Sequence, residues 1–335
     1  MLRAALTRSL GARRALASAR SRTNPPGAFR ALSGPAEGLD GVFVDVYGPV
    51  AILILYEGRA PKALDPARAA AEALEVLRPL GVRAVYVKPF AKDRSKLGGD
   101  LPEASLSPTP AAGEPLPESF AIREHEWLLE IRPYDGLSTG LFLDQRENRR
   151  WVYDGAARRA AQGRPCAVLN TFAYTCAFSV AAAKAGATTA SVDVSGRYLD
   201  WGKRNFELNG IDPAAHRFAK MDTFEFLGYA QRKGLRFDLV ILDPPSFASG
   251  NKKKGIKPWS STADYARLIH EAAGVLNPGG AIFASTNTAE LCRPGRLERE
   301  VVRALGTTPR WLTLPATAED FADEQERFAA VAFVV

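Results

Sequence analysis

The segment Asp243-Pro244-Pro245-Ser246-Phe247 carries the most specific chemical signal in this chain. It follows the apolar run 237–242, whose unbroken hydrophobicity is typical of a strand buried in a parallel sheet. The prolines end that strand, so Asp243 stands at its carboxyl end, where open α/β sheets bind ligands. A carboxylate, rigid backbone carbonyls and the Phe247 ring suit a planar substrate that carries nitrogen. An ordinary strand-ending turn explains these residues equally well, so the surrounding residues must decide.

Two further acids end the preceding predicted strands, Asp193 the second and Asp222 the third. Asp193 lies near the offset of roughly 20 residues at which an acid meets ribose hydroxyls. Each acid would also serve as a helix cap, but acids at three successive strand ends favour one shared pocket. The loop 171–178 after the first strand lacks the glycine fingerprint that a pyrophosphate requires. A cofactor with a ribose and an adenine but no phosphate fits, and S-adenosylmethionine is such a cofactor.

Repeated strand–helix units from about Pro165 predict the sheet that positions these residues. Such alternation is typical of a doubly wound parallel sheet, and the fold class is therefore α/β. Residues 37–135 predict a separate small α/β domain that contains a long surface loop from Lys92 to Pro117, rich in Gly, Pro, Ser and Glu. The strands of the larger domain are predicted at 166–170, 189–194, 216–221, 237–243, 280–286, 310–315 and 327–335.

The net charge of +7 belongs to the first 36 residues, which hold seven arginines and no acid. The 37 remaining basic residues balance the 37 acidic ones. An Arg-rich, acid-free leader with Ala, Ser and Leu predicts an organellar transit peptide, disordered and cleaved near Arg30-Ala31-Leu32-Ser33. A mitochondrial destination is favoured, with a plastid as the alternative. A disordered basic tail that binds RNA is the other interpretation.

Composition also limits the other partners. Three cysteines and three histidines lack metal-ligand spacing, so we predict no metal site. No apolar run approaches the roughly 18 residues of a membrane helix, so we predict no membrane partner.

Several segments together resemble the class I large-subunit ribosomal RNA methyltransferases. The resemblance covers roughly residues 38–335 and implies a Rossmann-like methyltransferase domain over 136–335, behind the small α/β domain. It implies large-subunit rRNA or a pre-ribosomal particle as the partner. Cys176 departs from the family pattern, which has glycine at that place. The resemblance rests on 139–146, 170–175, 191–195, 198–201, 204–205, 208–210 and 243–247.

The resemblance also implies a set of cofactor contacts. Gln145 and Arg146 are expected to reach the methionine end of S-adenosylmethionine, with a solvated charged turn as the alternative. The other cofactor-binding residues are expected to be Asn170, Ala173, Tyr174, Thr175, Asp193, Asp222 and Asp243.

The expected substrate contacts follow from the turn after the fourth strand. Asp243 and the Pro244 carbonyl accept hydrogen bonds from the base, Phe247 stacks on it, and Asn287 orients it. The basic stretch that follows predicts phosphate contact with base stacking, although a charge run is usually a solvated loop. The residues expected to bind RNA are Lys252, Lys253, Lys254, Lys257 and Trp259.

The triplet Ser285-Thr286-Asn287 distinguishes two target atoms. Carbon 5 of cytosine needs an enzyme cysteine to add to the ring, and the resemblance puts that cysteine where this chain has Thr286. A guanine ring nitrogen has a free lone pair, so positioning supplies most of the catalysis. The resemblance gives the guanine nitrogen-7 branch Ser-Asn-Asn at this place, and Asn287 matches its last residue, so the chain resembles that branch more closely and we favour a guanine ring nitrogen. One alternative is methylation of cytosine carbon 5, with Cys292 as a displaced nucleophile. The other is a non-catalytic RNA-binding assembly factor, and the departure at Cys176 is its only support.

Overall fold

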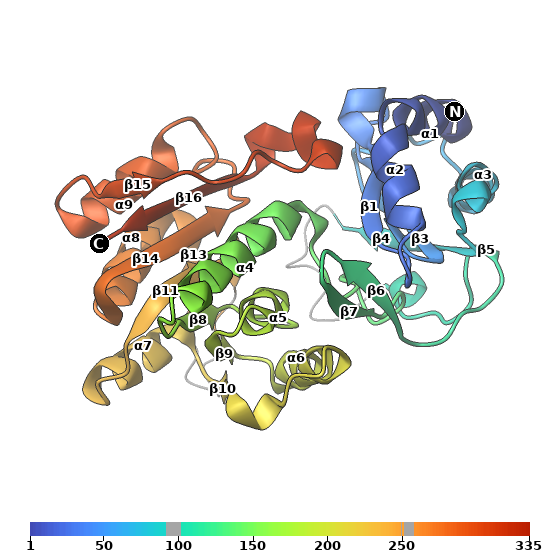
Figure 1. Cartoon of the computed structure of the whole chain (residues 1–335). Helices are drawn as coiled ribbons and strands as arrows, with labels where there is room; N and C mark the ends of the chain where they lie inside the picture. Colours follow the sequence, from blue (N-terminus) through green and yellow to red (C-terminus); the bar gives the residue numbers. More distant parts are fainter. Residues whose placement is uncertain (92–101, 249, 251–257) are drawn as a thin grey trace. The chain divides into compact units, whose positions relative to one another are not determined.

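The computed structural model describes residues 1–91, 102–248, 250 and 258–335. Contacts divide the chain into two compact units (Figure 1). The first unit comprises Met1–Arg146 and Thr317–Asp323, and the second comprises Glu147–Ala316 and Glu324–Val335. The boundary predicted between 135 and 136 therefore differs from the division by contacts, and the first unit also takes in a late segment of the chain.

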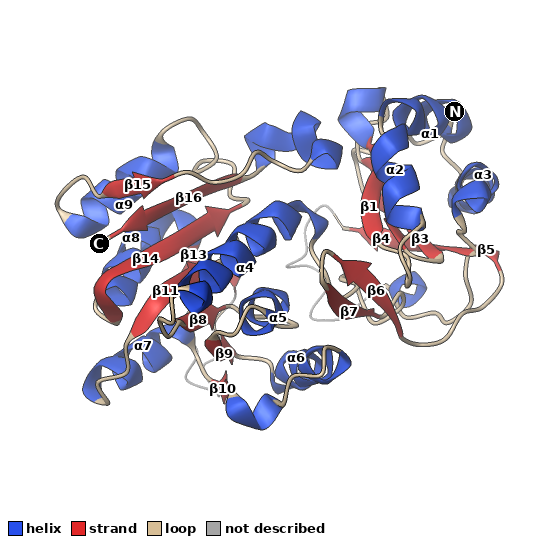
Figure 2. Cartoon of the chain, viewed as in Figure 1, coloured by secondary structure: helices blue, strands red, loops and turns tan. Residues whose placement is uncertain are grey.

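The first unit is built on a five-stranded sheet in the order β1-β2-β3-β4-β5 (Figure 2). Its strands are β1 (Ala28–Ser33), β2 (Val42–Tyr47), β3 (Val50–Tyr56), β4 (Ala84–Phe90) and β5 (Ala112–Gly113). Only β3 and β4 run parallel, because helix α3 (Pro66–Leu77) connects them. Asp65 caps that helix by accepting from the N–H groups of Ala67 and Arg68, as its sequence predicts. A hairpin of β6 (Phe120–Glu124) and β7 (Trp127–Ile131) completes the strands.

The N-terminal residues are folded in this structure, so the expectation of disorder over 1–36 is wrong. They form helices α1 (Leu2–Ala12) and α2 (Arg14–Ser21) and strand β1. Leu2 and Leu6 are fully buried in the core of the first unit, where α1 packs on α3. Leucines of the predicted transit peptide thus pack against apolar residues within the chain. Whether the segment also directs import stays a prediction.

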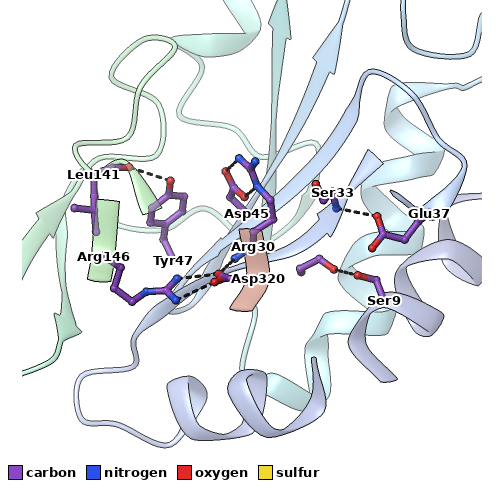
Figure 3. A network of polar contacts seen from close by, with 10 residues as sticks. Ser9, Arg30, Ser33, Glu37, Asp45, Tyr47, Leu141, Arg146 and Asp320 are labelled. Carbon is purple, nitrogen blue, oxygen red and sulfur yellow. Dashed lines mark hydrogen bonds and ion pairs between the residues drawn. The ribbon is translucent and has the colours of Figure 1, made fainter. Parts of the chain in front are cut away.

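A buried polar network explains why the first unit extends beyond residue 135 (Figure 3). Tyr47 Oη donates to the carbonyl of Leu141 at 3.2 Å. Asp320 accepts from the backbone N–H of Arg30 at 2.8 Å and from both terminal nitrogens of Arg146. These bonds join 136–146 and 317–323 to β1 and β2. Short 3₁₀ segments lie at Gly34–Glu37, Arg78–Leu80, Glu103–Ser105, Leu143–Gln145 and Glu319–Arg327.

The second unit holds a seven-stranded sheet in the order β10-β9-β8-β11-β14-β16-β15. The first five strands of that order run parallel, and β16 runs antiparallel to both its neighbours. This arrangement confirms the predicted doubly wound α/β fold. The strands are β8 (Ala167–Thr171), β9 (Thr188–Asp193), β10 (Arg217–Lys220), β11 (Phe237–Leu242), β14 (Leu276–Thr286), β15 (Arg310–Leu312) and β16 (Ala329–Val334).

Helices cover both faces of this sheet (Figures 1 and 2). One buried cluster joins Val240 and Ile282 to helices α7 (Thr223–Arg232), α8 (Ser261–Ala273) and α9 (Arg296–Leu305). The opposite cluster joins Val168 and Ile241 to α4 (Arg146–Ala161) and α5 (Ala177–Lys184). Successive strand residues thus enter opposite cores, which is why the strands are continuously apolar. The remaining elements are α6 (Gly196–Leu208), a 3₁₀ turn at Pro213–Ala215, and the short pair β12 (Phe247–Ala248) and β13 (Trp259–Ser260).

Candidate functional site

The register of the parallel strands brings the predicted site residues to one edge of the sheet. Thr171 at the end of β8 is paired with Val192 on β9 and with Leu242 on β11. Leu242 is in turn paired with Ala284 on β14. Asp193, the loop after β8, Asp243 and Ser285 therefore follow one another across adjacent strands, with Asp193 and Asp243 two strand spacings, about 10 Å, apart. The chain order reverses at β8, and such a switch point is where doubly wound sheets bind ligands.

The loop after β8 holds three non-glycine residues in the left-handed region: Phe172, Tyr174 and Cys176, with φ of 53°, 49° and 63°. A side chain in this region costs roughly 1–2 kcal/mol, and such strain persists only where surrounding contacts impose it. The N–H of Ala173 donates to the Val192 carbonyl at 2.9 Å, and Asn205 Nδ2 donates to the Thr175 carbonyl at 2.9 Å. The loop thus takes up conformations that glycines usually provide, although no glycine is present.

Asp193 joins this loop to the end of β9. Its two carboxylate oxygens accept from the N–H of Tyr174 at 2.9 Å and the N–H of Ser195 at 2.8 Å. Burial raises the pKa of the Asp193 carboxyl, and the two backbone N–H groups oppose that shift. A carboxylate has about four lone-pair sites, so these bonds leave acceptor capacity for hydroxyl groups.

The turn after β11 is held rigidly by hydrogen bonds from neighbouring elements. Ser285 Oγ donates to Asp243 Oδ1 at 2.7 Å. The Pro245 carbonyl accepts from Trp259 Nε1 at 2.7 Å and from Ser261 Oγ at 3.0 Å. These contacts fix the Asp243 carboxylate and the backbone carbonyls of the turn before any substrate arrives, which is the condition for electrostatic preorganisation.

Helix α8 contributes a further support through Tyr265, which is fully buried. Its hydroxyl donates to the Ser285 carbonyl at 2.7 Å and lies 3.4 Å from the Leu242 carbonyl. Burial, and then the nearby Asp243 charge, raise the pKa of Tyr265 well above its usual value, so the hydroxyl stays a donor. Tyr265 thus ties the ends of β11 and β14 together.

The outer side of the turn is open. Phe247 is 66% exposed, and Asn287 is exposed with its Oδ1 accepting from Ser246 Oγ at 2.6 Å. Pro244 is buried. Hydrogen bonds therefore join the turn that holds Asp243 and Phe247 to the end of β14 and Asn287, and the Phe247 side chain in that turn is accessible.

Other predicted residues have structural partners. Asp222 caps α7 by accepting from the N–H groups of Phe224 and Glu225, the alternative that its sequence position allowed. Asn170 is 2% exposed and donates to Ser179 Oγ at 3.0 Å inside the second unit. Thr175 is 1% exposed, so its side chain is buried and it contributes to the loop through its backbone.

Two predictions are wrong. Arg146 is fully buried in the first unit, where its guanidinium binds both oxygens of Asp320 at 2.9 and 2.8 Å (Figure 3). Burial alone would raise the pKa of Asp320, but the bonds and charge of Arg146 lower it below its usual value. Arg146 is therefore a structural ion-pair residue and not a cofactor ligand. Its neighbour Gln145 is also buried in the first unit.

The prediction that Trp259 binds RNA is the second wrong one. This residue is only 6% exposed, its ring lies 5.8 Å from that of Phe172, and its N–H is bound to the turn, so it does not offer a face for stacking on RNA. An aromatic residue beside a lysine run predicts a surface position, whereas the short strand β13 places Trp259 in the core. The four predicted RNA-binding lysines, Lys252, Lys253, Lys254 and Lys257, lie outside the described residues.

Sequence reasoning did not identify Ser261 and Tyr265, and it gave no role to Asn205, which carries part of the resemblance. Ser261 and Tyr265 both contact the end of β11 or its turn from helix α8, and a lone serine or tyrosine inside a helical pattern carries no functional signal. Among the described residues, no group of three His, Cys, Asp or Glu side chains has a metal-binding arrangement. In the same part of the chain, no helix combines the length and apolarity of a membrane span.

Comparison with known proteins now bears on this site. Residues 105–309 match the family model described as S-adenosylmethionine-dependent methyltransferase. The chain belongs to this methyltransferase family. It is 36% identical over 285 residues to YwbD of Bacillus subtilis (strain 168) and 36% identical over 203 residues to ribosomal RNA large subunit methyltransferase K of Neisseria meningitidis serogroup B. It is 32% identical over 284 residues to ribosomal RNA large subunit methyltransferase K/L of Colwellia psychrerythraea.

These matches cover 85%, 60% and 84% of this methyltransferase-family chain. They span 66%, 54% and 36% of the three relatives, less than two thirds of each. Among solved structures, the chain is similar to SMU.776, crystallised in complex with SAH, with 28% identity and a TM-score of 0.80. That similarity covers 100% of this chain and 81% of the other. It confirms the predicted Rossmann-like methyltransferase fold.

Proposed function

We propose that this protein transfers a methyl group from S-adenosylmethionine to a base of large-subunit ribosomal RNA, free or in a pre-ribosomal particle, and that the target is a guanine ring nitrogen. The observation that carries the proposal is the Asp243 carboxylate, fixed by Ser285 at the switch point of the sheet, in the same short turn as the exposed Phe247. Two relatives that bear the name of large-subunit rRNA methyltransferase support the choice of RNA.

The residues present fit the cofactor. Asp193 offers carboxylate acceptors for ribose hydroxyls, and the strained backbone of 172–176 lies beside it. Val194, 49% exposed, adds apolar surface at the same strand end. S-adenosylmethionine, when bound, supplies a methyl group on a positively charged sulfur, which a lone pair can attack.

The substrate end of the site needs to orient a base and little more. The carboxylate of Asp243 accepts from an N–H group of the base, and the Pro244 carbonyl accepts from a second. Phe247 stacks on the ring, and such stacking contributes roughly 1–3 kcal/mol per base. Asn287 holds the edge of the base. A ring nitrogen with a free lone pair then requires no general base, so orientation supplies most of the rate.

The surroundings of Cys292 favour nitrogen over cytosine carbon 5. Its Sγ donates to the Thr286 carbonyl at 3.5 Å, and burial raises the pKa of the thiol. A nucleophilic cysteine requires the opposite shift, toward the thiolate. Cys292→Ser is therefore expected to keep full methyl-transfer activity, and a loss of activity would instead support carbon 5.

The decisive experiment compares large-subunit rRNA from cells with and without the gene by mass spectrometry of nucleosides. Loss of a methylated guanosine is expected, and re-methylation of the deficient particle by purified protein should restore it. Asp243→Asn is expected to lower kcat about 10²–10³-fold, whereas Asp212→Asn, which keeps a cap on the 3₁₀ turn at Pro213–Ala215, should not. If no methylated guanosine or cytidine disappears, the ribosomal assignment is wrong.

Mitochondrial import is part of the proposal, with a plastid as the alternative. Its support is the Arg-rich, acid-free composition of residues 1–36. Because Leu2 and Leu6 of this segment are buried in the core of the first unit, import would have to precede folding. Microscopy of the full chain fused at its carboxyl end to a fluorescent protein is expected to give an organellar signal, and a diffuse signal would contradict import.

A further inference from the structure

Cys176 and Gly202 fit into one another at the start of α5. Cys176 is fully buried and has a left-handed backbone. A Cβ at Gly202, inside helix α6, would lie 2.4 Å from Cys176 Sγ and 2.9 Å from its Cβ. Both distances are shorter than any real Cβ contact, so the cysteine occupies the volume that a side chain at 202 would need.

The same helix holds the two residues before Cys176. Asn205, one turn beyond Gly202 and fully buried, donates to the Thr175 carbonyl at 2.9 Å. The ring of Tyr198 packs edge-on against Tyr174, with centroids 4.5 Å apart. Three consecutive loop residues, 174–176, are therefore held by α6, which begins at Gly196, shortly after Asp193.

Both members of the pair are unfavourable in isolation. A cysteine resists the left-handed backbone that glycine accepts, and a glycine weakens a helix relative to alanine. The two unfavourable residues contact each other, and this contact explains both. The absence of a side chain at Gly202 leaves the space that the Cys176 side chain occupies, and Cys176 in turn fixes the loop.

We infer that Cys176 and Gly202 are a matched pair of positioning residues that sets the cofactor affinity of the loop 172–176. Neither touches the cofactor; they act through the backbone of Tyr174 and Thr175. The inference rests on the proposed use of S-adenosylmethionine, and it predicts that a side chain at 202 is tolerated only when the side chain at 176 is removed.

The test measures the Kd for S-adenosylhomocysteine by isothermal titration, and the melting temperature without ligand, in the full-length protein. Gly202→Ala is expected to raise Kd by about tenfold or more, as overpacking distorts the loop. Cys176→Gly combined with Gly202→Ala should return Kd to near the wild-type value, since the nearest remaining atom is the Thr175 carbonyl carbon at 3.5 Å. Cys176→Ala with Gly202→Ala should restore less, because the two Cβ atoms still lie 2.9 Å apart.

Gly155→Ala in α4 is the matched control, since a Cβ there meets only Arg158 Nη2 at 3.9 Å. It is expected to leave Kd unchanged. Wild-type affinity in Gly202→Ala, or equal affinity in the two double variants, would overturn the inference. If Gly202→Ala does not fold, the two double variants still carry the comparison. If the wild-type protein does not bind S-adenosylhomocysteine, the proposed function fails instead, which separates the two outcomes.

Discussion

Replacing Lys88 by methionine is expected to stabilise the first unit in a pH-dependent way. Lys88 lies in β4, is 1% exposed, and its Nζ has no hydrogen-bond partner among the described residues. Burial lowers the pKa of the ammonium from 10.5 to about 7. The folded chain must therefore release a proton that the unfolded chain retains at neutral pH.

The magnitude follows from this difference in pKa. One pKa unit corresponds to about 1.4 kcal/mol, so a lysine that titrates near 7 when folded and near 10.5 when unfolded costs about 4 kcal/mol of stability at pH 7. Between pH 7 and 10.5 the unfolded state binds more protons, so the free energy of unfolding of the wild-type protein rises with pH. Below pH 7 this contribution is constant.

The assay is urea unfolding of wild type and Lys88→Met at pH 7 and pH 9, because the difference between the two proteins cancels other titrating groups. The advantage of the methionine variant is expected to shrink by about 2 kcal/mol from pH 7 to pH 9. Lys62→Met, at an exposed position, is the control and should show no such change. An advantage that is equal at both pH values would refute the assignment of a desolvated, neutral lysine.

Three further outcomes test the supports of the fold and site. Arg146→Met leaves Asp320 buried without its main partner, so the free energy of unfolding in urea is expected to fall by about 3–5 kcal/mol. The double variant Arg146→Met with Asp320→Leu should recover much of that loss. A single variant as stable as wild type would contradict the structural role of the ion pair. Tyr265→Phe removes the donor to the buried Ser285 carbonyl, so a loss of about 1–3 kcal/mol with a fall in kcat is expected, and unchanged kcat would remove Tyr265 from the positioning network. Deleting residues 1–36 removes α1, α2 and β1, so circular dichroism should show an unfolded first unit; native melting would contradict their packing.

The local sequence pattern was sufficient to predict the fold of the second unit. Continuous apolar strands separated by amphipathic helices predict a doubly wound sheet, and the parallel register then carries Asp193, the loop 171–176 and Asp243 to one edge. The turn at Asp243-Pro244-Pro245 was recognisable because proline chemistry is local. Asn287 came from the resemblance of Ser285-Thr286-Asn287 to the guanine nitrogen-7 branch and not from local pattern.

Contacts between segments that are distant in the chain could not be predicted from the local sequence pattern. Arg146 is 174 residues from Asp320 in the chain, so a charged turn and a buried ion pair look identical until the chain folds. Trp259 shows the same limit, because a two-residue ladder with Phe247 and Ala248 turns its ring toward the core. The N-terminal helices bear an apolar face that suits either a receptor or the core of the first unit.

Residue order along the chain established the fold class, the strand ends and the acids that stand there, because periodicity, proline and strand length act within a few residues. Packing between elements established how rigidly the site is held and which residues hold it. Ser285, Tyr265 and the fit between Cys176 and Gly202 depend on side-chain volumes and donors that meet across separate strands and helices. Such encounters have no signature in sequence spacing, since they exist only once the sheet has formed.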